Sequence, residues 1–186
     1  MRTRSSKRVS STPEGAFNLI RRNLATAVVA VFADYAVAAT PCASEQPPST
    51  REDLVVAIIG FAGEHMRGSL VITARASSVD SWRGPFGNID ATIDVRDILG
   101  ELANMVLGRV KGRLLKEGLP ILMSTPTTAR GPAVMLARSG GPEEQLGFAG
   151  DGWSVSARLD AAFDDAFGLQ EAPTAVAAEA GDVMLF

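Results

Sequence analysis

Apolar residues recur at steps of three and four between Ala16 and Ala39, which predicts an amphipathic helix. Thr12-Pro13-Glu14 provides a helix-start signal, and Thr40-Pro41 provides a stop signal. We therefore expect a core helix over residues 16–39 whose apolar side packs against the rest of the domain. The residues that form this side are Phe17, Ile20, Leu24, Ala27, Val28, Val31, Tyr35 and Ala38.

The same segment has an alternative interpretation as a secretory signal. Arginines precede an apolar stretch at Ala25–Ala33, and small residues follow between Ala36 and Ala43. Asp34 interrupts the apolar stretch, which is also too short to span a membrane. We expect residues 16–39 to remain in the protein, whereas cleavage near residues 39–43 would instead indicate a secreted α+β domain of an unrelated kind.

The next patterns predict a β-hairpin. Residues 41–50 are rich in Pro and Ser and are typical of a connector. The apolar run from Leu54 to Phe61 and the run from Gly68 to Ala74 flank a turn at residues 62–67. Two strand-like runs around a loop that contains glycine favour antiparallel pairing.

The second half of the chain combines one long helix with several extended segments. Residues 77–90 contain Gly and Pro and predict a loop with a short helix, and Asp94–Glu117 predicts a long helix that ends at Gly118 and Pro120. The order of these elements indicates an α+β fold, in which an antiparallel sheet packs against two long helices. The segments expected to be extended are Ile121–Arg130, Val134–Arg138, Gln145–Ala149 and Trp153–Leu159.

The helix predicted at residues 94–117 has two different sides. At 100° per residue, a polar set falls within an arc of roughly 60°. Lys111 flanks this arc. The polar set comprises Asp97, Glu101, Asn104 and Gly108, and the apolar set expected to face the sheet comprises Ile98, Leu99, Leu102, Met105, Val106, Val110 and Leu114.

Composition excludes several kinds of site. The 186 residues include one Cys and one His, so the chain has no intramolecular disulfide and no zinc site that needs two Cys or two His ligands. His65 lies in a predicted turn, where a surface position is expected, and this disfavours a metal hydrolase. We expect no metal ligands in this chain.

Charge is unevenly distributed along the chain. The first 22 residues are basic, and residues 139–186 contain nine acids and only Arg158. A basic end suits contact with nucleic acid or an anionic membrane, but it is more simply a solvated terminus. We therefore expect a disordered basic segment at residues 1–13, a folded domain at 14–162, an acidic Ala-rich tail at 163–186, and neither nucleic acid nor a membrane as partner.

The polar side of the long helix resembles the motif of the CheC/CheX/FliY chemotaxis phosphatases. Their motif is an Asp or Ser, three residues, a Glu, two residues and an Asn, and the chain matches it at Asp97, Glu101 and Asn104. Residues 58–63 resemble the first hairpin of the family, and residues 119–131 resemble the strand after its helix. The resemblance covers residues 53–160, and the single Glu/Asn helix favours the CheX-like branch. Many relatives have Gly-Asn-Ala-Lys where this chain has Gly108-Arg109-Val110-Lys111.

The resemblance implies an activity and a partner. Family members remove the phosphoryl group from the aspartyl phosphate of a CheY-like response regulator, which itself supplies Mg²⁺, so no cofactor of the chain's own is expected. Asn104 is then expected to orient the hydrolytic water and Glu101 to dock the regulator, with Asp97, Gly108 and Lys111 also contacting it. The resemblance further suggests a cytoplasmic homodimer. The alternative is a CheX-like module that binds receiver domains without hydrolysis.

Overall fold

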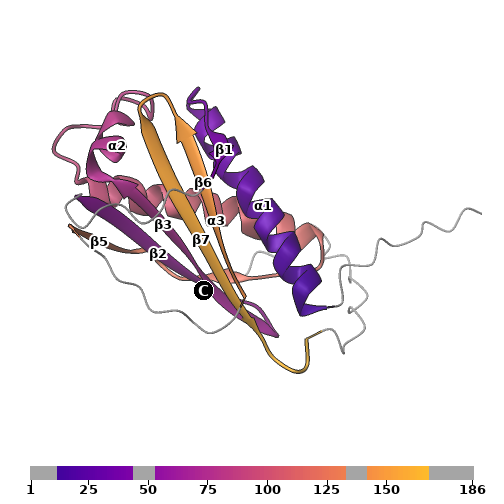
Figure 1. Ribbon diagram of the computed structural model, residues 1–186. Helices are drawn as coiled ribbons and strands as arrows, with labels where there is room; N and C mark the ends of the chain where they lie inside the picture. The colour runs from indigo at the N-terminus through magenta and orange to yellow at the C-terminus, as the bar shows by residue number, and fades with distance from the viewer. Residues whose placement is uncertain (1–11, 44–52, 133–141, 168–186) are drawn as a thin grey trace, which may run out of the picture.

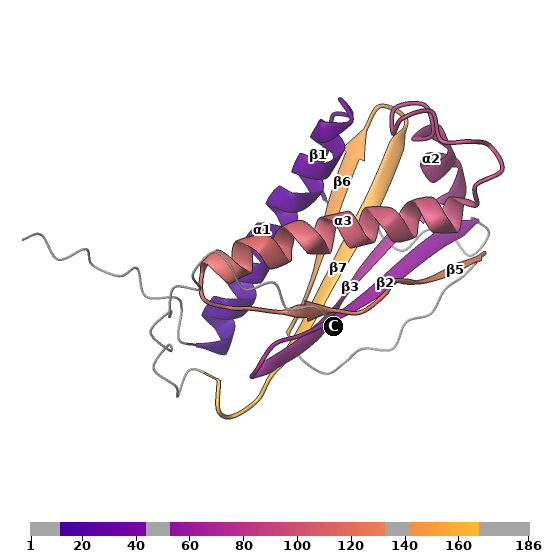
Figure 2. The ribbon, with the colours of Figure 1, turned by 180° about the vertical axis from the view of Figure 1, so that it is seen from behind.

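The structure, a computed structural model, describes residues 12–43, 53–132 and 142–167. Within these ranges, seven antiparallel strands form one sheet in the order β1-β6-β7-β3-β2-β4, and β5 also pairs with β2. Figure 1 shows strands β6, β7, β3 and β2 side by side, and Figure 2 shows helix α3 lying across the sheet. Residues of α1 and α3 share one core with the same face of the sheet. The fold is therefore α+β with an antiparallel sheet and two long helices, as the sequence predicts. The elements are α1 Pro13–Asp34, β1 Thr40–Cys42, β2 Leu54–Ala62, β3 Met66–Arg75, α2 Ala76–Ser81, α3 Val95–Lys116, β4 Leu122–Met123, β5 Thr127–Gly131, β6 Glu143–Gly150 and β7 Trp153–Phe163.

Helix α1 starts where the sequence predicts and ends earlier. Thr12 caps it by accepting a hydrogen bond from the Gly15 N–H, and Pro13 occupies the first turn. The predicted continuation to Ala39 is wrong, because Ala36 adopts φ 57° and the Val37 N–H bonds back to the Phe32 carbonyl. This turn directs residues 40–42, expected to lie outside any strand, into β1 beside β6.

The apolar side of α1 is part of the core. Its buried residues contact α3 and the sheet, and the Phe32 ring stacks on Trp153 of β7 with centroids 4.6 Å apart. By length and hydropathy alone α1 could cross a membrane, contrary to the sequence expectation, but a core helix passes the same test. The expected burial of four residues is confirmed, and these are Phe17, Leu24, Val28 and Val31.

The predicted hairpin is confirmed, with a shorter turn. Strands β2 and β3 pair from Leu54 opposite Arg75 to Ala62 opposite Arg67, so only residues 63–65 form the turn instead of 62–67. Alternate residues of β2, including Val55, Ala57 and Ile59, belong to the core beneath the helices. The hairpin thus forms the centre of the sheet that carries α3.

Strands β6 and β7 confirm the two predicted segments in the last part of the sheet, and β4 and β5 lie within the extended segment predicted at residues 121–130. The short helix expected within residues 77–90 is α2. The strand predicted at residues 134–138 lies outside the described residues. So do most of the two terminal segments, of which Thr12, Pro13 and residues 163–167 are described.

Candidate functional site

Helix α3 forms almost as the sequence predicts. The Asp94 carboxylate caps its first turn by accepting a hydrogen bond from the Arg96 N–H at 2.8 Å, and Gly118 follows its end with φ 79°. The expected buried side is observed, except that Met105 is only partly buried. Three further side chains extend the buried side beyond the expected set, and these are Val95, Ala103 and Leu107.

The expected polar side of α3 faces solvent. Asp97, Glu101, Asn104, Gly108 and Lys111 are all exposed. The Asn104 Nδ2 atom lies 3.5 Å from the Glu101 Oε2 atom, so these two side chains are neighbours at the middle of the helix. The structure thus brings the five predicted site residues onto one helix face.

Neighbouring elements hold α3 on both sides of this face. On one side Arg109 forms an ion pair with Asp34 at the end of α1, and the Tyr35 hydroxyl lies 3.5 Å from the Met105 sulfur. On the other side, a Cβ placed on Gly100 would lie 3.1 Å from Thr128 Cγ2 of β5. The ion pair with Asp34 gives Arg109 a structural role, because it joins α3 to the end of α1.

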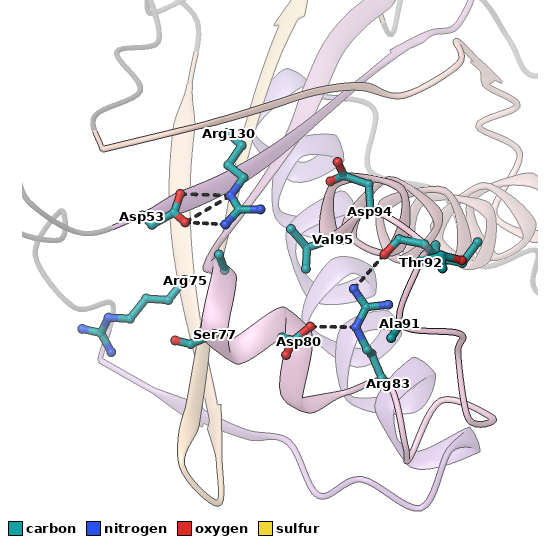
Figure 3. Close-up of a pocket in the computed structure, with 12 residues that line it drawn as sticks. Asp53, Arg75, Ser77, Asp80, Arg83, Ala91, Thr92, Asp94, Val95 and Arg130 are labelled. Carbon is teal, nitrogen blue, oxygen red and sulfur yellow. Dashed lines mark hydrogen bonds and ion pairs between the residues drawn. The ribbon is translucent and has the colours of Figure 1, made fainter.

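A polar pocket of about 660 Å³ lies beside the N-terminal end of α3. Its charged side chains are largely paired with one another, as Figure 3 shows for Asp53 with Arg130 and for Asp80 with Arg83. Hydrogen bonds from Arg130 hold the pKa of Asp53 below its ordinary value. Sequence analysis did not find this pocket, because its residues come from four separate segments and form no local motif.

The Asp94 carboxylate has the largest pKa shift near the site. Hydrogen bonds from the Arg96 guanidinium, and then from the Arg96 N–H, lower its pKa from 3.8 to about 2. A lowered pKa in the folded state means that the charged carboxylate stabilises the fold above about pH 4, where the unfolded chain is also ionised. This stabilisation is lost as pH falls from about 4 to about 2.

We expect Asp94→Ala to lower the melting temperature at pH 7, because the α3 cap and its charge are lost. The difference in melting temperature from the unaltered protein should shrink as pH falls from about 4 towards 2. Thermal unfolding followed by circular dichroism across this range measures it, with the exposed Asp165→Ala as control. A difference that stays constant down to pH 2 would contradict the assigned cap.

A metal site needs several His, Cys, Asp or Glu side chains close together. Among residues 12–43, 53–132 and 142–167, no three His, Cys, Asp or Glu side chains gather as metal ligands would. His65 is half-buried in the β2–β3 turn, with its Nδ1 atom 3.1 Å from the Asp164 carboxylate. The solvent-facing side of α3 offers the carboxylates of Asp97 and Glu101, the amide of Asn104 and the ammonium group of Lys111.

Solved structures share this fold. CheX from Vibrio vulnificus superposes with a TM-score of 0.65 at 19% identity, over 77% of this chain and 99% of that chain. A CheC-like superfamily protein from Shewanella sp. PV-4 gives 0.65 at 23%, over 77% and 97%. The CheX-CheY-BeF3-Mg+2 complex from Borrelia burgdorferi gives 0.57 at 16%, over 76% and 97%. At these identities the likeness establishes the fold.

A family model also matches part of the sequence. The family model described as chemotaxis phosphatase CheX matches residues 55–143, a range that contains the hairpin and all of α3. The chain is therefore CheX-like, as the resemblance of its sequence to the CheC/CheX/FliY family indicates. No match was found among curated proteins. In this CheX-like protein the family match includes the five solvent-facing positions of α3, from Asp97 to Lys111.

Proposed function

We propose that this CheX-like protein hydrolyses the aspartyl phosphate of a CheY-like response regulator. The observation that carries the proposal is the exposure of Asp97, Glu101 and Asn104 on one face of α3, at the spacing of the family motif. Exposed polar side chains are common on helices, so the spacing that matches the family motif adds the information that exposure alone lacks. The complex of a CheX with CheY and Mg²⁺ from Borrelia burgdorferi supports a partner of the same class.

Asn104 is proposed to orient the water. An amide side chain carries both a hydrogen-bond donor and an acceptor, so it can fix the direction of a water molecule in front of the phosphorus atom. The water oxygen bonds to phosphorus while the bond from phosphorus to the aspartyl oxygen breaks. The products are inorganic phosphate and the free carboxylate, and one proton goes to solvent. Mg²⁺ held by the regulator supplies charge stabilisation for the phosphoryl oxygens.

Glu101 is proposed to dock the regulator through a lysine. Its contact with Asn104 is long for a hydrogen bond, at 3.5 Å, so an ammonium group can replace it with little loss. The exchange also frees the Asn104 amide to bind water. Asp97, Gly108 and Lys111 border these two residues and are proposed to contact the regulator, and Asp97 also favours the first turn of the helix.

The function is tested by phosphate release from a panel of phosphorylated receiver domains, measured with and without this protein. Faster release from at least one receiver supports hydrolysis. Binding of a receiver without faster release would support the alternative, a CheX-like module that only docks receiver domains. A cytoplasmic homodimer, in contact with neither nucleic acid nor a membrane, is part of the proposal.

We expect Glu101→Gln to weaken regulator binding and to lower the rate of phosphate release. The loss should be larger at low salt than at high salt, because salt already screens the ion pair of the unaltered protein. Titrations of the responding receiver at two ionic strengths measure this effect, with Glu117→Gln at the end of α3 as a matched control. Equal affinities of Glu101→Gln and the unaltered protein at both salt concentrations would remove Glu101 from the interface.

A further inference from the structure

The solvent-facing side of α3 continues beyond the family motif. At 100° per residue, Gly112 and Leu115 fall on the same side as Glu101, Asn104 and Gly108. Both are exposed in the structure, and 61% of Leu115 is open to solvent. A single exposed leucine is ordinary on a protein surface, but Leu115 continues the helix face that carries Glu101 and Asn104.

Packing within the part of the chain that the structure describes does not explain two of the glycines on this side. Within residues 12–43, 53–132 and 142–167, a Cβ placed on Gly108 or on Gly112 would meet no atom within 4 Å, whereas one placed on Gly100 would meet Thr128. Glycine weakens a helix relative to alanine because it loses more backbone freedom on folding. Packing therefore explains Gly100. Gly108 and Gly112 leave a strip of helix surface without side chains, which the main chain of a partner protein can approach closely.

An interface of ordinary size is wide enough to extend from Asn104 to Leu115. Leu115 is eleven residues after Asn104, which corresponds to roughly 16 Å along the helix axis. A standard interface covers about 800 Å² on each partner, which corresponds to a radius of roughly 16 Å for a round patch. A globular domain centred on Asn104 therefore passes over both glycines and reaches Leu115.

We propose that the receiver domain bound at Glu101 and Asn104 also lies along α3 as far as Leu115. Its main chain passes over Gly108 and Gly112, an acidic side chain meets Lys111, and an apolar side chain covers Leu115. We assign this strip to the receiver because it is continuous with the proposed docking residues. Its negative charge at Glu101 and positive charge at Lys111 also fit a single partner that carries a positive and a negative group at matching positions. This inference rests on the proposed function.

The test compares exposed leucines on opposite sides of the molecule. Leu122 is 74% exposed and is paired with Ala62, so it lies on the face of the sheet opposite the core residue Phe61 and away from α3. Binding is measured by calorimetry with the receiver that responds in the phosphate-release panel, loaded with beryllofluoride and Mg²⁺. Leu115→Ser is expected to raise the dissociation constant about tenfold, and Leu122→Ser is expected to leave it unchanged.

Gly112→Ala provides a second variant that keeps the protein folded. It is expected to raise the melting temperature, because alanine favours the helix and its Cβ has open space, and to weaken receiver binding several-fold. A structural role alone would not produce opposite changes in these two measurements.

Three outcomes would overturn the inference in distinguishable ways. Equal affinities of Leu115→Ser and the unaltered protein would overturn the extended contact alone. Dissociation of a homodimer by Leu115→Ser, with receiver affinity unchanged, would assign the strip to a second copy of the chain. Absence of binding by every receiver to the unaltered protein would overturn the proposed function itself.

Discussion

Asn104→Ala is expected to reduce phosphate release from the responding receiver by at least about a hundredfold, while the affinity for that receiver is retained. Loss of one positioned hydrogen-bonding group commonly costs this much when the group acts on the reacting atoms in the transition state. The residues proposed to dock the receiver, Glu101 and the face around it, remain in the variant. The rate is measured at saturating receiver, and the affinity is measured with the beryllofluoride-loaded receiver.

Two controls distinguish orientation of water from loss of a surface amide. Asn18→Ala removes an exposed asparagine from α1 and should change neither quantity. Asn104→Asp keeps the size of the side chain but removes the N–H donors, and it should be nearly as slow as Asn104→Ala. Weaker binding of Asn104→Ala together with an unchanged rate at saturation would assign Asn104 to docking instead of to water.

Phe32→Ala is expected to lower the free energy of unfolding by about 3–5 kcal/mol, the usual cost of emptying a buried aromatic site. The Phe32 side chain is fully buried, and its ring contacts Trp82, Phe86 and Trp153 with centroids 5.2, 5.6 and 4.6 Å away. Equilibrium unfolding in urea measures the change.

The neighbouring residue provides the control for this prediction. Ala33 is exposed, so Ala33→Ser should change the free energy of unfolding little. A loss below about 1 kcal/mol for Phe32→Ala would mean that α1 does not contribute to the core, as expected of a cleaved or membrane-bound helix. A native protein whose first residue falls between Thr40 and Ser44 by mass spectrometry would lead to the same conclusion.

The elements that sequence analysis predicted well are those with local signals at their ends. Thr12 and Asp94 are N-terminal caps of α1 and α3, and Gly118 ends α3, so short segments were enough to place them. The end of α1 is a local turn at Ala36, a residue type that does not signal a positive φ, and the adjacent Tyr35 packs on the distant Phe86 with ring centroids 4.4 Å apart. Strand β1 depends on pairing with β6, more than one hundred residues later, and periodicity within a window cannot reveal such pairing.

The same distinction applies to the candidate site. Glu101 and Asn104 share one helix, so their spacing alone placed them on one exposed face. The ion pair between Asp34 and Arg109 joins residues 75 positions apart, and sequence analysis left Arg109 without a partner. The pocket beside Asp94 was missed for the same reason, because its charged residues converge only after the sheet and the α2 loop have formed.

The separation of α3 into a buried side and an exposed side has a consequence for how this protein can change over evolutionary time. Substitutions on the exposed side leave the packing against α1 and the sheet intact, so they carry little penalty in stability. If the proposed contacts hold, exchanging residues such as Lys111, Gly112 and Leu115 changes the choice of partner while the amide of Asn104, proposed to orient water, stays in place. One folded domain can in this way serve different receivers in descendants of the same ancestor.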